Sequence, residues 1–286
     1  MNTDLTTLAR RATRQMHGTY ARATQHQRTL PNFLIVGGQR CGTTTLYKTL
    51  SQHPGVLSAN LRKGVHYFDL HYDRQLSWYR SHFPTNRKVS SVDAANGYPT
   101  AVGESSPYYL WHPLAPKRIS NDLPGVKLLV LLRDPVERAY SAHAHERARG
   151  FETESFEQAL ELEPSRLGGQ EQRLVDGVTS RSFAHQHQAY RARGEYIDQL
   201  ERLAAAVGRQ QVLVIDSQDF WSSPEQVWPQ ITHFLELPEL PVVFERHNAR
   251  QRAPMSETVR QSLTAHFEPF DERLATWWGR TPSWRR

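Results

Sequence analysis

Cysteine and long apolar runs are nearly absent from this sequence of 286 residues. The single cysteine, Cys41, excludes an intramolecular disulfide, and a chain without disulfides is typical of a reducing compartment. No run of about 18 apolar residues exists that would cross a membrane as a helix. The N-terminus also lacks the apolar segment of a signal peptide. We therefore expect a cytoplasmic protein.

Acidic residues are in the minority. The chain has 35 Lys and Arg against 29 Asp and Glu, which gives a formal net charge of +6. Such a surface favours anionic ligands, but the charge is spread along the chain, so nucleic-acid binding does not follow from it. Hydrophobic residues make up 38% and charged residues 22%, a balance typical of globular rather than disordered chains. The sequence gives no indication of oligomeric state.

The first 30 residues form a basic N-terminal extension. It is either a solvated arm lying on the domain or a segment that contacts an anionic membrane or a partner. Pro31 ends any helix there, and residues 31–286 then have the size of one α/β domain. The basic residues of the extension are Arg10, Arg11, Arg14, Arg22 and Arg28.

Short apolar runs alternate with helical patterns in the rest of the chain. The runs at 33–36, 126–132 and 212–215 predict buried parallel strands, and 89–92 and 101–103 predict weaker ones. Alternating strands and helices predict an α/β fold: a three-layer sandwich with a central parallel β-sheet flanked by helices. We interpret the polar stretch 163–182 as a loop. It is either a mobile loop near the acceptor site or an ordinary surface loop. Helices are predicted at 44–50, 137–149, 190–207 and 224–235.

A glycine-rich turn follows the first strand. Gly37 and Gly42 have the spacing of a P-loop, in which backbone N–H groups and the next helix N-terminus surround a phosphate. The ATP-type loop requires Lys directly after the second glycine. Thr43 stands there instead, and the only cation inside the loop is Arg40. The turn therefore predicts that the three-layer sandwich is P-loop NTPase-like, with a phosphate site that differs from that of ATPases.

At this point the sequence resembles the PAPS-dependent sulfotransferases, where PAPS is 3′-phosphoadenosine 5′-phosphosulfate. It is most similar to the heparan sulfate sulfotransferase branch and its bacterial relatives. Residues 40–44, Arg-Cys-Gly-Thr-Thr, resemble the Lys-x-Gly-Thr-Thr core of the family's 5′-phosphosulfate loop. Residues 133–141, Arg-Asp-Pro-Val-Glu-Arg-Ala-Tyr-Ser, resemble its 3′-phosphate motif. The segments 63–69, 103–109 and 247–252 match further family segments in order, so the resemblance covers about residues 31–280.

The resemblance implies in-line transfer of a sulfuryl group to a hydroxyl or amine, with release of 3′-phosphoadenosine 5′-phosphate (PAP). It implies that Arg133 and Ser141 hold the 3′-phosphate, that Arg138 supports structure, and that Arg40 neutralises the leaving phosphate. A sulfonate carries less charge than a phosphoryl group, so no metal is required. The expected PAPS-binding residues are Arg40, Cys41, Gly42, Thr43, Thr44, Thr45, Arg133, Ser141, Arg250 and Arg252.

The proton acceptor is where this sequence departs from the family. Heparan-type enzymes have Glu directly after the Lys that corresponds to Lys63, and this chain has Gly64. His66 is the expected base because imidazole titrates near neutral pH, with a structural histidine as the alternative. Glu104 is a second candidate base; alternatively it orients Lys63 or His66, or is a hydrogen-bonded carboxylate beneath the loop. Lys63 either contacts the sulfonate or the acceptor or is solvated.

The acceptor is a small molecule, a lipid or a glycan. Several aromatic residues follow the expected strand ends and form either an acceptor pocket or ordinary core. Two other functions stay open: a P-loop kinase that uses ATP and Mg²⁺, which leaves Arg133 and Ser141 unexplained, and a PAP-binding protein that lost catalysis with the carboxylate at Gly64. The C-terminal residues Trp277, Trp278 and Trp284 are expected to pack. The aromatic residues concerned are Tyr67, Phe68, Trp78, Tyr108, Tyr109 and Trp111.

Overall fold

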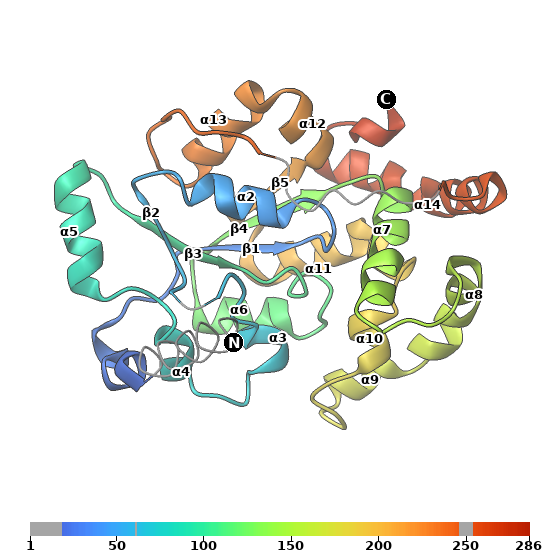
Figure 1. Cartoon of the computed structure of the whole chain (residues 1–286), viewed down its shortest axis with the longest axis horizontal. Coiled ribbons are helices and arrows are strands. Elements are labelled where there is room, and N and C mark those ends of the chain that lie inside the picture. Colours follow the sequence, from blue (N-terminus) through green and yellow to red (C-terminus); the bar gives the residue numbers. More distant parts are fainter. Residues whose placement is uncertain (1–18, 61, 246–253) are drawn as a thin grey trace, which may run out of the picture.

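The chain folds around one sheet. The computed structural model describes residues 19–60, 62–245 and 254–286. In these residues five parallel strands lie in the order β2-β3-β1-β4-β5, as Figure 1 shows. The strands are β1 (Phe33–Gly37), β2 (Val56–Ser58), β3 (Ala101–Ser105), β4 (Lys127–Leu132) and β5 (Val212–Asp216).

The inner strands are buried along almost their whole length. All five residues of β1 and of β3 are buried, and in β4 only Lys127 is partly exposed. Continuous apolar strands of this kind need helices on both faces of the sheet. Each buried Leu, Ile or Val removes apolar surface from water and contributes about 1.5–3 kcal/mol. The predicted strands at 33–36, 101–103, 126–132 and 212–215 are thus confirmed.

Helices cover both faces, so the predicted three-layer α/β sandwich is confirmed. Figure 1 shows α2 and α13 above the sheet and α6 below it, and α6 packs along α11. The helices are α2 (Thr43–Leu50), α3 (Tyr67–Leu70), α4 (Leu76–Arg80), α5 (Asn86–Asn96), α6 (Ala115–Asp122), α7 (Pro135–Ala148), α8 (Phe156–Leu167), α9 (Gln170–Val175), α10 (Phe183–His187), α11 (Tyr196–Val207), α12 (Ser217–Ser222), α13 (Pro224–Phe234) and α14 (Glu257–Trp278), with 3₁₀ turns η1 (Gln25–Gln27), η2 (Ala192–Gly194), η3 (Arg209–Gln211) and η4 (Ser283–Arg285).

The weak strand predicted at 89–92 is wrong, because these residues lie inside α5. Thr85 caps this helix by accepting a hydrogen bond from the Lys88 N–H at 3.3 Å, and Gly97 ends it in the left-handed conformation. Val89 and Val92 are three residues apart, a spacing that places both on one face of a helix but on opposite faces of a strand. The capping signals therefore outweigh the local β propensity of the two valines.

The loop predicted at 163–182 is also wrong for most of its length. It contains the end of α8 and all of α9, which leaves residues 168–169 and 176–182 between helices. Ser155 and Gln158 form a capping box at the start of α8, a signal that the polar composition of the stretch obscured. The helix predicted at 190–207 begins only at Tyr196, and α14 was not predicted. Trp277, Trp278 and Trp284 pack against the core as expected.

The strand order places the chain reversal at β1. From β3 on one side of β1 the chain crosses to β4 on the other side. In open parallel sheets, ligands bind at such a switch point, beyond the carboxyl ends of the strands. The segments that follow β1, β3 and β4 are therefore the place to look for a site.

Candidate active site

The P-loop turns from β1 into α2. Gly42 is the N-cap of α2 and has φ +96°. Residues other than glycine rarely adopt this left-handed backbone conformation. The Cys41 N–H donates to the Gly38 carbonyl at 3.1 Å, which closes the turn. The first N–H groups of a helix have no partner inside it, so Thr43 and Thr44 present donors and a positive dipole end beyond the loop. This geometry suits a phosphate.

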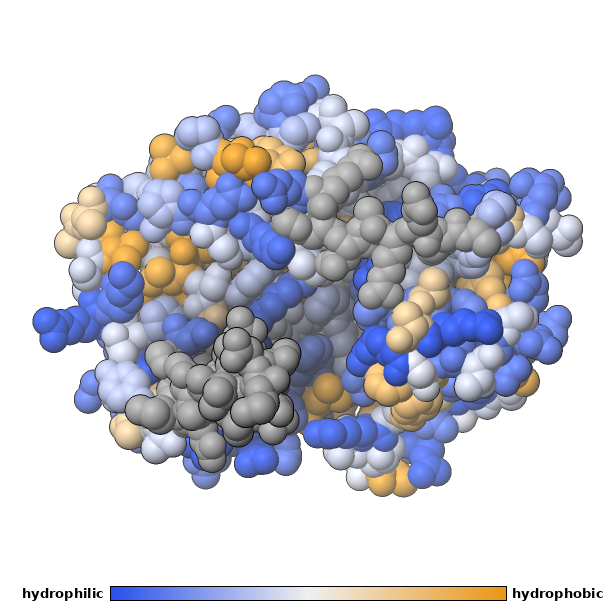
Figure 2. Space-filling view, viewed as in Figure 1, coloured by the Kyte–Doolittle hydropathy of each residue, from blue (hydrophilic) through white to orange (hydrophobic). Residues whose placement is uncertain are grey.

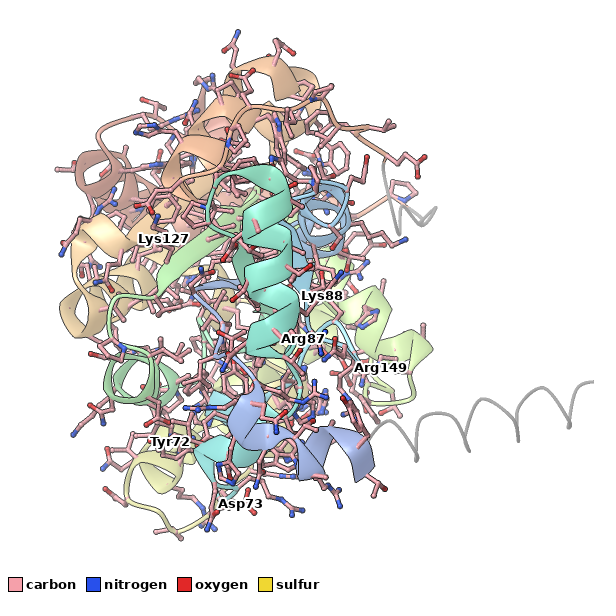
Figure 3. All side chains as sticks on the ribbon, turned by 90° about the vertical axis from the view of Figure 1, so that its left-hand side faces the viewer. Tyr72, Asp73, Arg87, Lys88, Lys127 and Arg149 are labelled. Atoms are coloured by element: carbon pink, nitrogen blue, oxygen red, sulfur yellow. The ribbon has the colours of Figure 1, made fainter. Side chains whose placement is uncertain are left out.

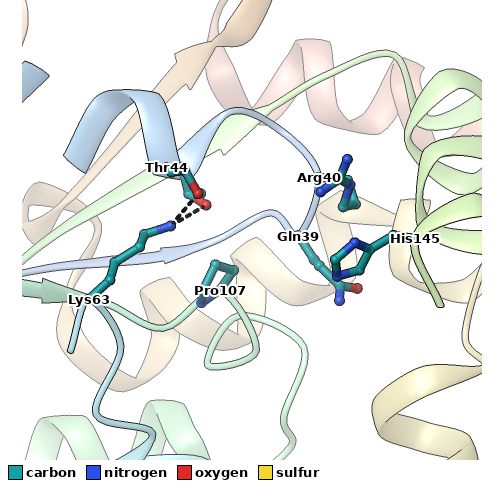
Figure 4. Close-up of a pocket in the computed structure, with 7 residues that line it drawn as sticks. Gln39, Arg40, Thr44, Lys63, Pro107 and His145 are labelled. Carbon is teal, nitrogen blue, oxygen red and sulfur yellow. Dashed lines mark hydrogen bonds between the residues drawn. The ribbon is translucent and has the colours of Figure 1, made fainter. Parts of the chain in front are cut away.

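A cavity of about 230 Å³ lies in front of this helix end. Figure 4 shows Lys63 and Arg40 approaching it from opposite sides, and Figure 2 shows a recess near the middle of this face whose visible walls are mostly hydrophilic. Two cations and a helix N-terminus around one space indicate a site for an anion. The cavity is lined by Gln39, Arg40, Thr43, Thr44, Lys63, Pro107 and His145.

Lys63 reaches the P-loop from the segment after β2. Its Nζ donates to Thr44 Oγ1 at 2.9 Å and lies 3.4 Å from Thr43 Oγ1. Burial disfavours the ammonium and lowers the pKa of Lys63 from 10.5 to about 8, although the charge of Glu104 acts in the opposite direction. Lys63 therefore lines the cavity as a cation, and its pKa is close to neutral pH.

The second motif runs from β4 into α7 and meets the P-loop. Asp134 caps α7 by accepting a hydrogen bond from the Val136 N–H at 2.8 Å. Ser141 is buried, and its Oγ accepts a hydrogen bond from Arg40 Nε at 3.2 Å. Residues 101 positions apart in the chain thus touch across the switch point.

The two arginines of the second motif have different surroundings. Arg133 keeps a third of its side chain exposed and lies 3.5 Å from Glu137, so its guanidinium is open to a ligand. Arg138 is 1% exposed and donates to the Tyr190 carbonyl. Arg138 is therefore a structural residue, as the sequence analysis expected.

His66 forms a pair with a buried carboxylate. Its Nδ1 lies 2.8 Å from Asp69 Oδ2, and its backbone has φ +57° at the start of α3. Burial by itself lowers the pKa of His66, but the hydrogen bond and charge of Asp69 outweigh it and raise the pKa above the ordinary value. Asp69 also accepts from the Leu70 N–H at 2.6 Å, which fixes its orientation.

Gly64 leaves the space that His66 uses. A Cβ at this position would lie 2.7 Å from the Ser105 carbonyl oxygen, a distance that real Cβ atoms essentially never show. The same Cβ would lie 3.3 Å from His66 Nε2. The backbone therefore excludes a Glu here as the loop stands, and the imidazole nitrogen occupies the adjacent volume.

Glu104 is a buried, hydrogen-bonded carboxylate. It is 0% exposed and accepts hydrogen bonds from the Val65 N–H and from Ser106, Tyr79 and Tyr109 hydroxyls. Glu104 lies beneath the 63–69 segment, which fits the alternative of a hydrogen-bonded carboxylate beneath the loop. Burial raises its pKa, which these bonds partly offset.

Other predicted site residues do not reach the cavity with their side chains. Cys41 is 1% exposed and its Sγ lies 3.6 Å from the Tyr196 hydroxyl. Thr45 is also buried, so these two residues have only their backbone to offer. Arg250 and Arg252 lie outside the described residues and stay predictions. Of the aromatic residues, Tyr67, Phe68, Tyr108 and Tyr109 are buried, which favours the core interpretation over an acceptor pocket.

Three residues that line the cavity were not predicted as site residues: Gln39, Pro107 and His145. His145 lies four residues after Ser141 in α7, hence on the same helix face, and that spacing was a usable signal. Gln39 Oε1 accepts from Arg193 Nη1, and its Nε2 donates to Glu146 Oε1 at 3.3 Å. Guanidinium only donates and carboxylate only accepts, so the amide orientation of Gln39 is fixed.

Two classes of feature are missing from the described ranges. Among residues 19–60, 62–245 and 254–286, no three His, Cys, Asp or Glu side chains gather as metal ligands would. In the same ranges no helix has the length and apolar character needed to span a membrane.

The chain is similar to known sulfotransferases. The sulfotransferase domain family profile matches residues 30–264. A sulfotransferase structure from Alicyclobacillus acidocaldarius is 30% identical, with a TM-score of 0.67 over 90% of this chain and 100% of that one. The membrane-associated sulfotransferase kil1 of Dictyostelium discoideum is 25% identical over 90% of this chain and 67% of its own length.

The heparan sulfate enzymes among the relatives are much longer proteins. The bifunctional heparan sulfate N-deacetylase/N-sulfotransferase of Drosophila melanogaster is 30% identical over 74% of this chain, which corresponds to 20% of its own length. The similarity therefore concerns one part of such an enzyme. By the extent of the profile match, this chain belongs to the sulfotransferase domain family.

Proposed function

We propose that this sulfotransferase takes the sulfuryl group from PAPS and transfers it to a hydroxyl or amine of a small-molecule, lipid or glycan acceptor. The observation that carries the proposal is the hydrogen bond of 3.2 Å from Arg40 Nε to Ser141 Oγ. It brings the P-loop and the second motif within reach of one ligand. A nucleotide with phosphates at both its 5′ and 3′ positions fits that arrangement.

Each end of the nucleotide has its own donors. The N-terminus of α2 and Arg40 bind the 5′-phosphate side, and Lys63 faces the sulfonate from across the cavity. Arg133 and Ser141 bind the 3′-phosphate, which ATP lacks. Thr43 stands where an ATP-type loop has Lys, which argues against the kinase alternative.

The base in this proposal is His66, oriented by Asp69. Because Nδ1 faces the Asp69 carboxylate, the ring proton lies on Nδ1 and Nε2 carries the lone pair. Nε2 takes the proton of the acceptor hydroxyl or amine as its oxygen or nitrogen attacks sulfur. The bond from sulfur to the 5′-phosphate oxygen breaks, and the electron pair stays on that oxygen, where Arg40 and Lys63 stabilise the charge.

The direct test is transfer of ³⁵S-labelled sulfuryl from PAPS to a panel of hydroxyl and amine acceptors, with and without EDTA. We expect a labelled product in both conditions and mass-spectrometric addition of one sulfuryl group. PAP binding without any labelled product would support the inactive PAP-binding alternative, and loss of transfer with EDTA would contradict the metal-independent chemistry.

A variant of the base separates chemistry from binding. His66→Asn should lower kcat by about 100-fold or more, the size expected for loss of a general base, and leave PAP affinity within about twofold. His233→Asn is the matched control, because His233 is exposed in α13. Normal turnover of His66→Asn would remove His66 from this role.

A further inference from the structure

A group of rings and one cation lies next to Glu146, which is bonded to the cavity residue Gln39, and we call it the ring wall: Arg149, Phe151, Phe183 and His187. The Arg149 guanidinium carbon lies 4.4 Å from the centre of the Phe151 ring. The His187 ring lies 4.4 Å from Phe151 and 5.0 Å from Phe183, measured between centroids. Phe183 is 54% exposed although it is a large apolar residue. The ring wall therefore presents aromatic surface to solvent.

Glu146 joins the ring wall to the cavity. Its carboxylate is 1% exposed and lies 3.1 Å from His187 Nδ1 and 3.2 Å from Arg149 Nη1. The same carboxylate accepts from Gln39, which lines the cavity. Gln39 lies on the side of the cavity opposite to Lys63 (Figure 4). An acceptor that extends from the cavity past Gln39 therefore meets the ring wall.

The exposed edge of Arg149 suits a negative group. Both bonds of Arg149 to Glu146 use Nη1, and 44% of the side chain is exposed. A guanidinium has five N–H donors in a planar fork, so one carboxylate does not exhaust it. Figure 3 shows Arg149 at the molecular surface, on the opposite edge from Lys127. The aromatic rings next to it offer faces and edges for stacking.

We propose that the ring wall is an acceptor subsite that binds a sugar or aromatic ring carrying a negative group. The ring packs on Phe183 and His187, and its anionic substituent binds Arg149. The nucleophilic hydroxyl or amine then lies in the cavity, toward His66. This inference rests on the proposed sulfuryl transfer and names the class of acceptor that this site takes.

The test compares two ligands that differ in one group. The binding of 4-nitrophenyl β-D-glucuronide and 4-nitrophenyl β-D-glucoside to the full chain is measured by calorimetry at saturating PAP. We expect the glucuronide to bind about tenfold more tightly, the size of one charge-assisted hydrogen bond. Arg149→Gln should remove this difference, and Phe183→Ala should weaken both ligands. Arg147→Gln is the control, because Arg147 is exposed in α7 two residues before Arg149.

Arg149→Lys keeps the positive charge but loses the planar fork of donors. We expect this variant to fold and to retain part of the preference for the glucuronide over the glucoside. Equal affinity of the two ligands, a preference that survives Arg149→Gln, or no binding of the glucuronide would overturn the subsite. PAP binding is measured in the same preparations. A chain that binds PAP without the preference loses only this inference, and a chain that binds no PAP loses the proposed function as well.

Discussion

The pH dependence of kcat/KM for PAPS follows from Lys63, which lines the cavity, and from His66, the proposed base. Lys63 must be protonated to stabilise negative charge, and burial lowers its pKa to about 8. His66 must be neutral to accept a proton, and Asp69 raises its pKa above the ordinary value. Activity is therefore lost as pH falls through the pKa of His66 and as pH rises through that of Lys63. We predict a narrow bell between these two limits.

The fall in kcat/KM at high pH, the alkaline limb, follows from the pKa of Lys63. With a pKa of about 8, about one tenth of the lysine is protonated at pH 9, so kcat/KM should fall about tenfold there. Lys63→Arg keeps the cation at every pH of the experiment because a guanidinium does not titrate in this range. The alkaline limb should therefore disappear in Lys63→Arg, whatever its activity at pH 7.

The acid limb tests the pairing of His66 with Asp69. Asp69→Asn removes the charge that raises the pKa of His66, so the acid limb should move to lower pH. The assay is initial-rate transfer of ³⁵S from PAPS over pH 5–10 in buffers of constant ionic strength. An alkaline limb that persists in Lys63→Arg, or an acid limb that stays in place in Asp69→Asn, would refute these assignments.

Three further substitutions have expected outcomes. Gly64→Ala places a Cβ 2.7 Å from the Ser105 carbonyl oxygen, so it should lower both Tm and kcat; unchanged values would show that the segment relaxes at no cost. Glu104→Gln puts an amide donor where the buried carboxylate accepts hydrogen bonds, and should reduce the free energy of unfolding by about 1–3 kcal/mol. It also removes a charge that raises the pKa of Lys63 and of His66, so both limbs of the pH profile should move to lower pH; loss of the acid limb would instead make Glu104 the base. Arg193→Met removes the donor to Gln39, so KM for the acceptor should rise while PAP affinity stays constant, and Arg193→Lys should restore part of it; a parallel loss of PAP affinity would contradict a positioning role.

The sheet and the turns that follow β1 and β4 could be predicted from the sequence because their signals are local. β4 is a run of apolar residues that ends at a capping Asp and a Pro, and every part of that pattern lies within ten residues. The P-loop is similar: its glycine at φ +96° and the helix after it are adjacent in the chain. Propensity and capping act over such short distances, so both features were predicted correctly.

The cavity wall could not be predicted in the same way, because its residues come from distant segments. Gln39 is bonded to Glu146 and Arg193, 107 and 154 residues away. Whether a polar residue faces a cavity or a partner depends on this packing, which no local pattern encodes. For the same reason the four hydroxyl and N–H donors to Glu104 became visible only in the fold, and with them its structural role.

The departure at Gly64 was visible in the sequence, but its consequence was not. The sequence showed a glycine where the resembled family has Glu, and left the base open among nearby residues. The structure adds that the Ser105 carbonyl excludes a Cβ at this position, and that His66 Nε2 lies beside it. The contact with Ser105 is tertiary, so the sequence alone could name His66 but could not show the space around it.

The central claim is that Arg133 and Ser141 recognise a 3′-phosphate while the P-loop holds the 5′ end. The most direct test is calorimetric comparison of PAP and ADP, which carry two phosphates each in different places. Two charge-assisted contacts to the 3′-phosphate predict that PAP binds about 100-fold more tightly or better. Arg133→Ala should remove most of that preference, and Arg87→Ala, on the exposed face of α5 (Figure 3), should not. Equal affinity of the wild-type chain for PAP and ADP would contradict the account.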